Sequence, residues 1–197
     1  MKNVFLSMRE DRIISLGETR DSIDQKLILW IKKVGLNPIL ISNNNNFELI
    51  KNINVAGVIL SGGNEVVKQS LRYKVEKKLL EWSLKRKKPI LGICHGMQFL
   101  IKYEKGKLSK VKNRVRKRIK IKTFGSNINY PSRVLCFYNH AVKNCPKIFN
   151  VTARSTENYI EAVRHKNNNW EGWMWHPERE KKFNSVLIKR AKKIFKI

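Results

Sequence analysis

A cysteine set between glycines carries the strongest chemical signal in the sequence. Residues 89–98 read PILGICHGMQ, an apolar run that ends at Cys94 and continues into a helix-forming pattern. A sharp turn from strand to helix with small neighbours exposes such a thiol as a nucleophile. The positive end of the helix favours the thiolate, and its free N–H groups can bind an oxyanion. The alternative for Cys94 is a buried strand-end cysteine whose glycines serve packing.

A second signal lies far downstream, in the segment GWMWHPE. Trp173 and Trp175 alternate as in a strand, so we expect His176 at the strand end and Glu178 pointing back at the imidazole after a turn fixed by Pro177. A carboxylate in that place orients the ring and stabilises the imidazolium formed when the ring takes a thiol proton. The alternative is an ordinary strand end with a surface carboxylate. We expect both tryptophans to lie in the core rather than to form a substrate platform.

A pair of glycines follows another apolar run. Residues 55–60 are apolar and end abruptly in Ser61, Gly62, Gly63 and Asn64. A strand followed directly by two glycines indicates backbone exposed to a ligand.

Short apolar runs alternate with longer amphipathic ones, which is typical of strands and crossover helices in an α/β fold. We expect strands at residues 4–8, 38–42, 55–60 and 90–93, and helices over 19–34, 70–87 and 183–195. Alternating basic and apolar residues in 105–122 predict one or two edge strands, with further strands at 133–138, 148–154, 159–164 and 172–175. The asparagines at 43–46 predict a polar loop without function, followed by a short helical stretch near Glu48. No repeat or linker is visible, so residues 1–197 are expected to form a single domain.

Composition limits the class of protein and of partner. The chain has 197 residues, 42% of them hydrophobic, which is enough apolar mass to exclude wholesale disorder. Its 42 Lys and Arg against 15 Asp and Glu give a net charge of +27, which attracts polyanions such as nucleic acid or phosphorylated small molecules. A coding bias toward lysine, asparagine and isoleucine explains the same excess without any functional role.

The sequence also indicates compartment and redox chemistry. No stretch approaches the roughly 18 consecutive apolar residues needed to cross a bilayer, and the N-terminus turns charged before an apolar signal core forms. We therefore expect a soluble, cytoplasmic protein with no membrane partner. Cys94, Cys136 and Cys145 are an odd number without paired metal-ligand spacing. We expect no disulfide framework, no metal, no cofactor and a single reactive thiol.

Four motifs taken together resemble the class I glutamine amidotransferase family, most closely its free-standing γ-glutamyl hydrolase branch. They are GICHGMQ, the upstream LSGGN, YNHAV at residues 138–142 and the late WHPE, in the family's order and spacing. The resemblance implies a flavodoxin-like α/β fold, an open and mostly parallel sheet with helices on both faces and a few antiparallel edge strands. It places the thiol at the carboxyl end of a central strand.

The resemblance also implies roles for individual residues. Cys94, His176 and Glu178 would form a Cys-His-Glu triad that cleaves a γ-glutamyl amide through a thioester. Backbone N–H groups of His95 and of Gly62 or Gly63 would form the oxyanion hole. The amino and carboxylate ends of the γ-glutamyl group would be held by Gln98 and by the stretch Asn139, His140 and Ala141.

The sequence departs from the family at two places. Related hydrolases often open the helix before the elbow with Arg, Asp and then Glu; Arg72 and Glu76 fit, but Tyr73 stands in the Asp position. We expect this to weaken a structural interaction rather than catalysis. Residues 110–122 are also more basic than the family pattern and lack histidines that some relatives carry there.

A narrower resemblance concerns the N-terminal segment SMREDRIISLGETRDSIDQ and the short chain, which are similar to γ-glutamyl-CDP-amidate hydrolases of a capsule phosphoramidate pathway. It implies a nucleotide-bearing substrate, with glutamate and cytidine diphosphoramidate as products. The loops at residues 9–20 and 64–72 lie at the carboxyl edge of the predicted sheet, where open α/β folds bind ligands. Because a guanidinium binds two phosphate oxygens at once, we expect Arg9, Arg20 or both to contact an anionic leaving group. The alternative is a solvated surface pair.

Other functions stay open at this point. A γ-glutamyl-aminobutyrate-type hydrolase fits the same motifs. A glutaminase subunit that passes ammonia to a separate synthase also fits, but it needs a partner protein, and we expect no obligate synthase partner. A non-catalytic nucleic-acid binding protein is supported only by the basic alternation at residues 112–122.

Overall fold

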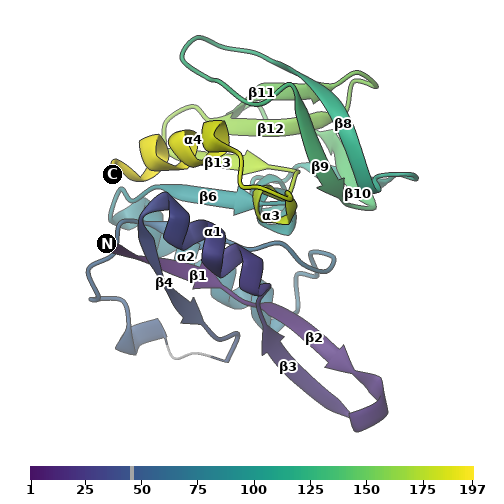
Figure 1. Cartoon of the computed structure of the whole chain (residues 1–197). Helices are drawn as coiled ribbons and strands as arrows, with labels where there is room; N and C mark the ends of the chain where they lie inside the picture. Colours follow the sequence, from purple (N-terminus) through teal and green to yellow (C-terminus); the bar gives the residue numbers. More distant parts are fainter. Residues whose placement is uncertain (45–46) are drawn as a thin grey trace.

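An open sheet with helices on both faces forms the body of the protein (Figure 1). The computed structural model describes residues 1–44 and 47–197. The strands lie in the order β4 (Leu36–Ile41), β1 (Lys2–Ser7), β5 (Val58–Leu60), β6 (Ile90–Ile93), β13 (Trp170–Trp173), β12 (Ile160–His165), β11 (Phe149–Ser155), β8 (Val115–Thr123) and β9 (Arg133–Phe137). From β4 to β13 neighbouring strands are parallel, and from β13 to β9 they are antiparallel.

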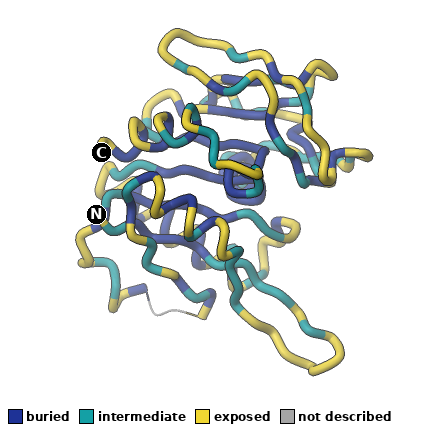
Figure 2. The backbone as a smooth tube through the Cα atoms, in the orientation of Figure 1, coloured by how far each residue is buried: buried dark blue, intermediate teal, exposed yellow. Residues whose placement is uncertain are grey.

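Helices cover the two faces of the parallel half. Figure 1 shows α1 (Gln25–Val34) and α4 (Ser185–Phe195) in front of the sheet, with α2 (Leu71–Lys85) and α3 (His95–Tyr103) behind it. Helix α1 buries one stripe, formed by Leu27, Trp30, Ile31 and Val34, whereas α3 is buried on all sides over residues 95–101. The central parallel strands β5 and β6 are apolar because both their faces are covered, and the tube of Figure 2 is accordingly buried through the centre of the sheet.

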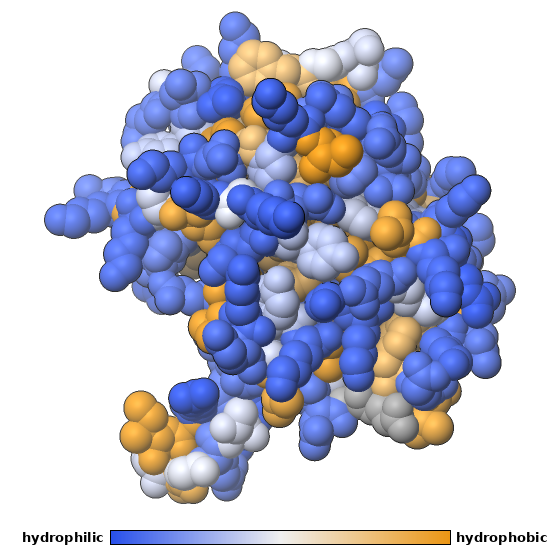
Figure 3. All heavy atoms as spheres, turned by 180° about the vertical axis from the view of Figure 1, so that it is seen from behind, coloured by the Kyte–Doolittle hydropathy of each residue, from blue (hydrophilic) through white to orange (hydrophobic). Residues whose placement is uncertain are grey.

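A β-hairpin replaces part of the predicted first helix and the predicted loop at residues 9–20. β2 (Arg9–Ile13) and β3 (Glu18–Ser22) pair antiparallel around a short 3-10 turn, η1 (Ile14–Leu16), which Gly17 closes with a φ of 63°. Helix α1 begins only at Gln25, because Asp24 caps it by accepting the N–H of Lys26. The prediction of a helix from residue 19 was therefore wrong in its first part. The hairpin protrudes from the body, with apolar residues at its tip (Figure 3).

The structure corrects three smaller predictions. β8 is not an edge strand, because β11 and β9 flank it. β7 (Lys107–Lys110) pairs instead with β10 (His140–Asn144), a strand that the sequence did not predict.

Of the asparagine run, Asn43 is buried and its side-chain amide donates to Asp21, whereas residues 45–46 lie outside the described part. The short helical stretch near Glu48 is the 3-10 turn η2 (Phe47–Leu49).

Both predicted core tryptophans are buried. Trp173 ends β13, and Trp175 follows it outside the regular strand, where it bridges to Cys136 of β9. Their rings stack with centroids 5.6 Å apart, and Tyr130 packs edge-on against both. They therefore serve packing under the end of the sheet, as expected.

Four buried carboxylates each face a buried cationic group or imidazole. Glu76 pairs with Arg72, Glu171 with Arg190, Glu178 with His176, and Glu161 lies 4.0 Å from Arg114. Glu161 also accepts a 2.6 Å hydrogen bond from the Tyr138 hydroxyl. Burial nevertheless raises the pKa of Glu161 to about 7.

Among the described helices, none combines the length and apolarity that a membrane span needs.

Candidate active site

Cys94 occupies a strained turn between β6 and α3. Its φ of 49° and ψ of −99° lie outside the regions that L residues favour, and its N–H donates to the Trp173 carbonyl at 2.6 Å. Glycines permit this geometry: a Cβ on Gly96 would lie 2.3 Å from the Leu60 carbonyl oxygen, and one on Gly92 would lie 2.6 Å from Gly96. The start of α3 thus lies directly on β5 and β6, as the elbow prediction requires. The expectation that this turn exposes the thiol was wrong, because Cys94 is buried beside the His176 ring and is only 4% exposed.

His176 stands beside this turn and is oriented by Glu178. The Nδ1 atom of His176 and the Oε1 atom of Glu178 are 2.5 Å apart, across the turn η3 (Pro177–Arg179). The backbone N–H of His176 donates to the Leu135 carbonyl of β9 at 3.1 Å. Both side chains are buried, so water competes little for this contact.

The electrostatics favour a charged imidazole. Burial alone would lower the pKa of His176, but the Glu178 carboxylate and the Cys94 thiol, which also hydrogen-bonds the ring, raise it to about 9. Since Nδ1 is held by Glu178, Nε2 is the ring nitrogen left for Cys94. The three predicted triad residues therefore meet, with the imidazole between thiol and carboxylate.

Gly62 lies against the edge of this imidazole. A Cβ at position 62 would stand 2.5 Å from His176 Cε1. Arg72 Nη2 donates to the carbonyls of Ser61 at 2.7 Å and of Gly62 at 3.4 Å. Because N–H and C=O point in opposite directions across a trans peptide, the N–H groups of Gly62 and Gly63 face away from Arg72.

The side chain of His95 points away from the thiol. Its Nε2 lies 2.9 Å from Glu76, and its Nδ1 contacts the carbonyl of Asn64. Burial would raise the pKa of Glu76, but Arg72 and His95 lower it to about 2. His95 thus has only its backbone N–H free for an oxyanion, in the first turn of α3 where N–H groups lack helical partners.

The substitution at Tyr73 leaves this network intact. Arg72 and Glu76 form their i,i+4 ion pair at 3.0 Å without any help from position 73. Tyr73 itself packs edge-on against Phe99 of α3, with centroids 5.1 Å apart.

The residues expected to hold a γ-glutamyl group gather one helical turn beyond the thiol. Gln98 Nε2 donates to the His140 carbonyl at 2.9 Å, and the neighbouring Ala141 is buried. His140 Nε2 lies 2.9 Å from Glu65, a residue of the loop after β5. The side chain of Asn139 is exposed, and its carbonyl accepts the N–H of Val111.

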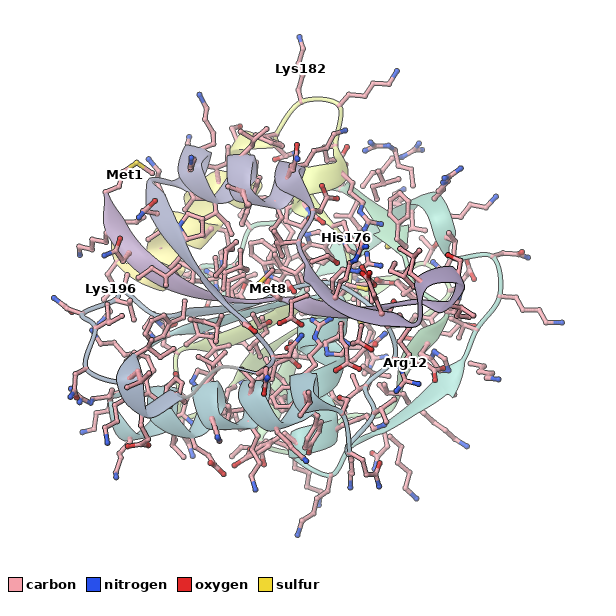
Figure 4. All side chains as sticks on the ribbon, turned by 90° about the horizontal axis from the view of Figure 1, so that it is seen from below. Met1, Met8, Arg12, His176, Lys182 and Lys196 are labelled. Carbon is pink, nitrogen blue, oxygen red and sulfur yellow. The ribbon has the colours of Figure 1, made fainter. Side chains whose placement is uncertain are left out.

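The two rim arginines lie on the hairpin, and each pairs with a carboxylate of the same hairpin. Arg9 binds Asp11 through Nε and Nη2, and its Cβ would be 3.1 Å from a Cβ on Gly63. Arg20 pairs with Glu18 on the exposed part of β3. Figure 4 views the molecule from below, with Met8 and Arg12 of the hairpin region and His176 labelled. The structure thus brings Arg9, and not Arg20, to the glycine loop.

Sequence reasoning missed the contribution of β9. The Phe137 ring packs edge-on against the His176 ring, with centroids 5.7 Å apart. The Arg179 guanidinium lies over the Phe137 ring, 4.4 Å from the centre of that ring. Phe137 stands in no motif, because its approach to His176 depends on the order of strands in the sheet, whereas Arg179 directly follows Glu178 on η3.

Comparison with known proteins identifies the family. The family model described as glutamine amidotransferase class-I matches residues 16–191. The chain belongs to the class-I glutamine amidotransferase family. A glutamine amidotransferase from Thermotoga maritima, 17% identical, superposes with a TM-score of 0.68 over 99% of this chain and 84% of that one. The α/β fold expected for class-I glutamine amidotransferases is thereby confirmed.

Curated relatives of this class-I amidotransferase differ in what they do. Gamma-glutamyl-CDP-amidate hydrolase of Campylobacter jejuni subsp. jejuni serotype O:2 is 32% identical over 157 residues, covering 77% of this chain and 76% of the relative. A glutamine-hydrolysing GMP synthase subunit of Methanococcus vannielii is 31% identical over 154 residues, covering 75% and 78%. The chain also matches longer GMP synthases, such as that of Oceanobacillus iheyensis, of which it spans 36%.

Proposed function

We propose that this protein is a cysteine-dependent γ-glutamyl hydrolase in which Cys94, His176 and Glu178 act as a triad. The observation that carries the proposal is the placement of the His176 ring between the thiol and the Glu178 carboxylate, at the start of α3. A raised pKa of about 9 keeps the ring protonated beside the sulfur, which favours a thiolate–imidazolium pair at neutral pH.

The proposed reaction has two halves. The Cys94 thiolate attacks the γ-carbonyl carbon, and the resulting oxyanion accepts hydrogen bonds from the backbone N–H groups of His95 and of Gly62 or Gly63. His176 gives its proton to the leaving nitrogen, and the C–N bond breaks to leave a γ-glutamyl thioester. The neutral ring then takes a proton from water, whose oxygen attacks the thioester and releases glutamate and the free thiol.

For the substrate we propose γ-glutamyl-CDP-amidate, which yields glutamate and cytidine diphosphoramidate. Support comes from the Campylobacter relative of similar length and from the position of Arg9 beside the glycine loop. The guanidinium of Arg9 suits a diphosphate if it exchanges Asp11 for the phosphate oxygens. Arg20 would add long-range attraction from the outer hairpin. In this reaction neither a cofactor nor an obligate synthase partner takes part.

A second candidate is a glutaminase subunit that supplies ammonia to a separate synthase. The match over three quarters of the chain to the Methanococcus GMP synthase subunit, a protein of similar length, favours it. The same triad would then act on glutamine, and a partner protein would be needed for full activity.

One experiment separates these candidates. Glutamate release should be measured from γ-glutamyl-CDP-amidate, γ-glutamyl-aminobutyrate and glutamine, with the purified chain alone and with the Cys94→Ser variant as blank. We expect kcat/KM to be highest for the CDP-amidate. Glutamine as the best substrate would favour the glutaminase candidate, and no release from any of the three would contradict γ-glutamyl hydrolysis.

A further inference from the structure

Two adjoining cavities lie at the edge of the sheet opposite the thiol. The first, of about 520 Å³, is lined by residues at the amino ends of parallel strands, namely Lys2 of β1, Pro89 before β6 and Asn169 before β13. The second, of about 360 Å³, shares Asn169 and Lys196 with the first. We call the two cavities together the basic furrow. Figure 4 shows its residue Lys196 at the left edge of the molecule, away from His176.

The charged side chains of the basic furrow all have the same sign. Among the described residues that line either cavity, none is an aspartate or a glutamate. Arg190 also lines the second cavity, but Glu171 pairs with it from the interior. Because the remaining cations repel one another, the furrow attracts anions. The lysines that line it are Lys2, Lys87, Lys88, Lys166, Lys193 and Lys196.

Two of the lysines in the first cavity are held by backbone carbonyls, and two are not. Lys2 Nζ donates to the Lys196 carbonyl at 3.4 Å, and Lys88 Nζ donates to the Val55 carbonyl at 2.8 Å. Within the part of the chain that the structure describes, no hydrogen bond or ion pair engages the side chain of Lys87 or of Lys196. The ammonium groups of Lys87 and Lys196 are therefore free to bind a ligand.

Both free lysines stand at helix ends where glycine is usual. Lys87 follows α2 with a φ of 51°, and Lys196 caps α4 with a φ of 53°. Glycine takes this left-handed conformation without the steric cost that a Cβ brings. The helix dipole favours a cation near a carboxyl end, but Lys85 and Lys192 already stand in the last turns of α2 and α4. The helix ends therefore do not explain why positions 87 and 196 are lysine.

We infer that the basic furrow binds a linear oligophosphate, held by the ammonium groups of Lys87 and Lys196. An ammonium is a compact point charge that binds phosphate oxygens without the directional demands of a guanidinium. A chain of phosphates carries several adjacent negative charges and reaches cations of both cavities, whereas a single carboxylate neutralises only one. Two sources carry this chemistry, a short inorganic polyphosphate and the phosphate tail of a nucleoside triphosphate. The inference does not depend on the proposed function.

Calorimetry with inorganic tripolyphosphate tests the furrow against the charge of the whole surface. At about 0.1 M salt, where the Debye length is about 10 Å, we expect Kd to rise about tenfold in Lys87→Gln/Lys196→Gln, because two exposed ammonium–phosphate contacts are lost. Lys87→Arg/Lys196→Arg keeps the charge and should bind like the wild type.

Lys181→Gln/Lys182→Gln is the matched control, because it removes the same charge from two exposed lysines outside the furrow. Its Kd should change less than about twofold. Equal losses in the two glutamine variants, or a wild type that does not bind tripolyphosphate, would overturn the inference.

A second measurement uses the wild type alone. Acetic anhydride labelling read by mass spectrometry should show that tripolyphosphate protects Lys87 and Lys196 but not Lys181 and Lys182, and uniform protection would contradict the site. ATP and adenosine then distinguish the sources. ATP that binds only as tightly as tripolyphosphate would assign the phosphate chain alone, and tighter binding of ATP would add a nucleoside to it. Adenosine that binds as tightly as ATP would refute an oligophosphate site.

Discussion

Substituting Gly62 by alanine tests whether the position of the imidazole limits the reaction. The new Cβ would stand 2.5 Å from His176 Cε1, whereas unbonded carbons prefer about 3.5 Å or more, so ring or loop must move by roughly 1 Å. The ring cannot move alone, because Glu178 holds Nδ1 and Leu135 holds the backbone. Since a misplacement of about 1 Å can cost on the order of 100-fold in rate, we expect kcat to fall about 100-fold.

Gly57→Ala provides a matched control for packing. A Cβ at Gly57 would meet the Pro89 carbonyl oxygen at the same 2.5 Å, but before β5 begins rather than after it ends. Neither glycine has a positive φ, so alanine tolerates both backbones. Glutamate release and urea unfolding should be measured for both variants. We expect Gly57→Ala to lose stability with kcat nearly unchanged. A folded Gly62→Ala enzyme with wild-type kcat would refute the argument that the ring is fixed in place.

Three further outcomes follow from the same contacts. Iodoacetamide at neutral pH should modify Cys94, which lies beside the protonated His176, and abolish turnover. The pKa values of Cys136 and Cys145 are raised, so these thiols should stay protonated and unreactive. Peptide mapping that finds only Cys136 and Cys145 labelled would contradict the assignment of Cys94 as the nucleophile. His176→Ala should lower kcat far more than Glu178→Gln does. His176→Ala removes the group that carries the proton, whereas Glu178→Gln removes only the charge that orients it. A wild-type kcat in His176→Ala would exclude the mechanism. Because the pKa of His176 is raised from 6.5 to about 9, its stabilising contribution is complete below about pH 6.5 and is lost as pH rises through about 9. Urea unfolding across this range should therefore show falling stability in the wild type and a flatter dependence in Glu178→Gln, and parallel curves would contradict the coupling.

The sequence predicts the parallel half of the fold well and the hairpin not at all. Strands buried on both faces appear as short apolar runs, and amphipathic helices as stripes, so β1, β5, β6 and α2 could be located from local periodicity. The hairpin of β2 and β3 has mostly polar residues that pair across a turn, and apolar periodicity does not detect such pairing. The predicted first helix, residues 19–34, had its first apolar residue at Ile23, and its polar beginning belongs to β3.

The candidate site shows the same contrast between residues with a local sequence signal and residues that only the fold brings together. Cys94 lies within a local motif, and His176 and Glu178 are two residues apart, so the chemistry of one turn is visible in the sequence. Phe137 and Glu65 have no such signal, since strand order brings β9 beside His176 and a loop contact brings Glu65 to His140. Sequence reasoning therefore selected the three candidate triad residues, which the fold brings together, but missed Phe137 and Glu65.

Within the part of the chain that the structure describes, every buried carboxylate pairs with a buried cation or imidazole. This pairing determines how the stability of the fold depends on salt. Since the interior is close to charge-balanced, nearly all of the +27 excess lies on the outside and holds a cloud of counter-anions. Like charges on a folded surface stand closer together than on an expanded chain, so their repulsion opposes folding. Raising the ionic strength shortens the Debye length to about 10 Å at 0.1 M and weakens that repulsion. The anions around the protein thus weaken this repulsion and favour the folded state.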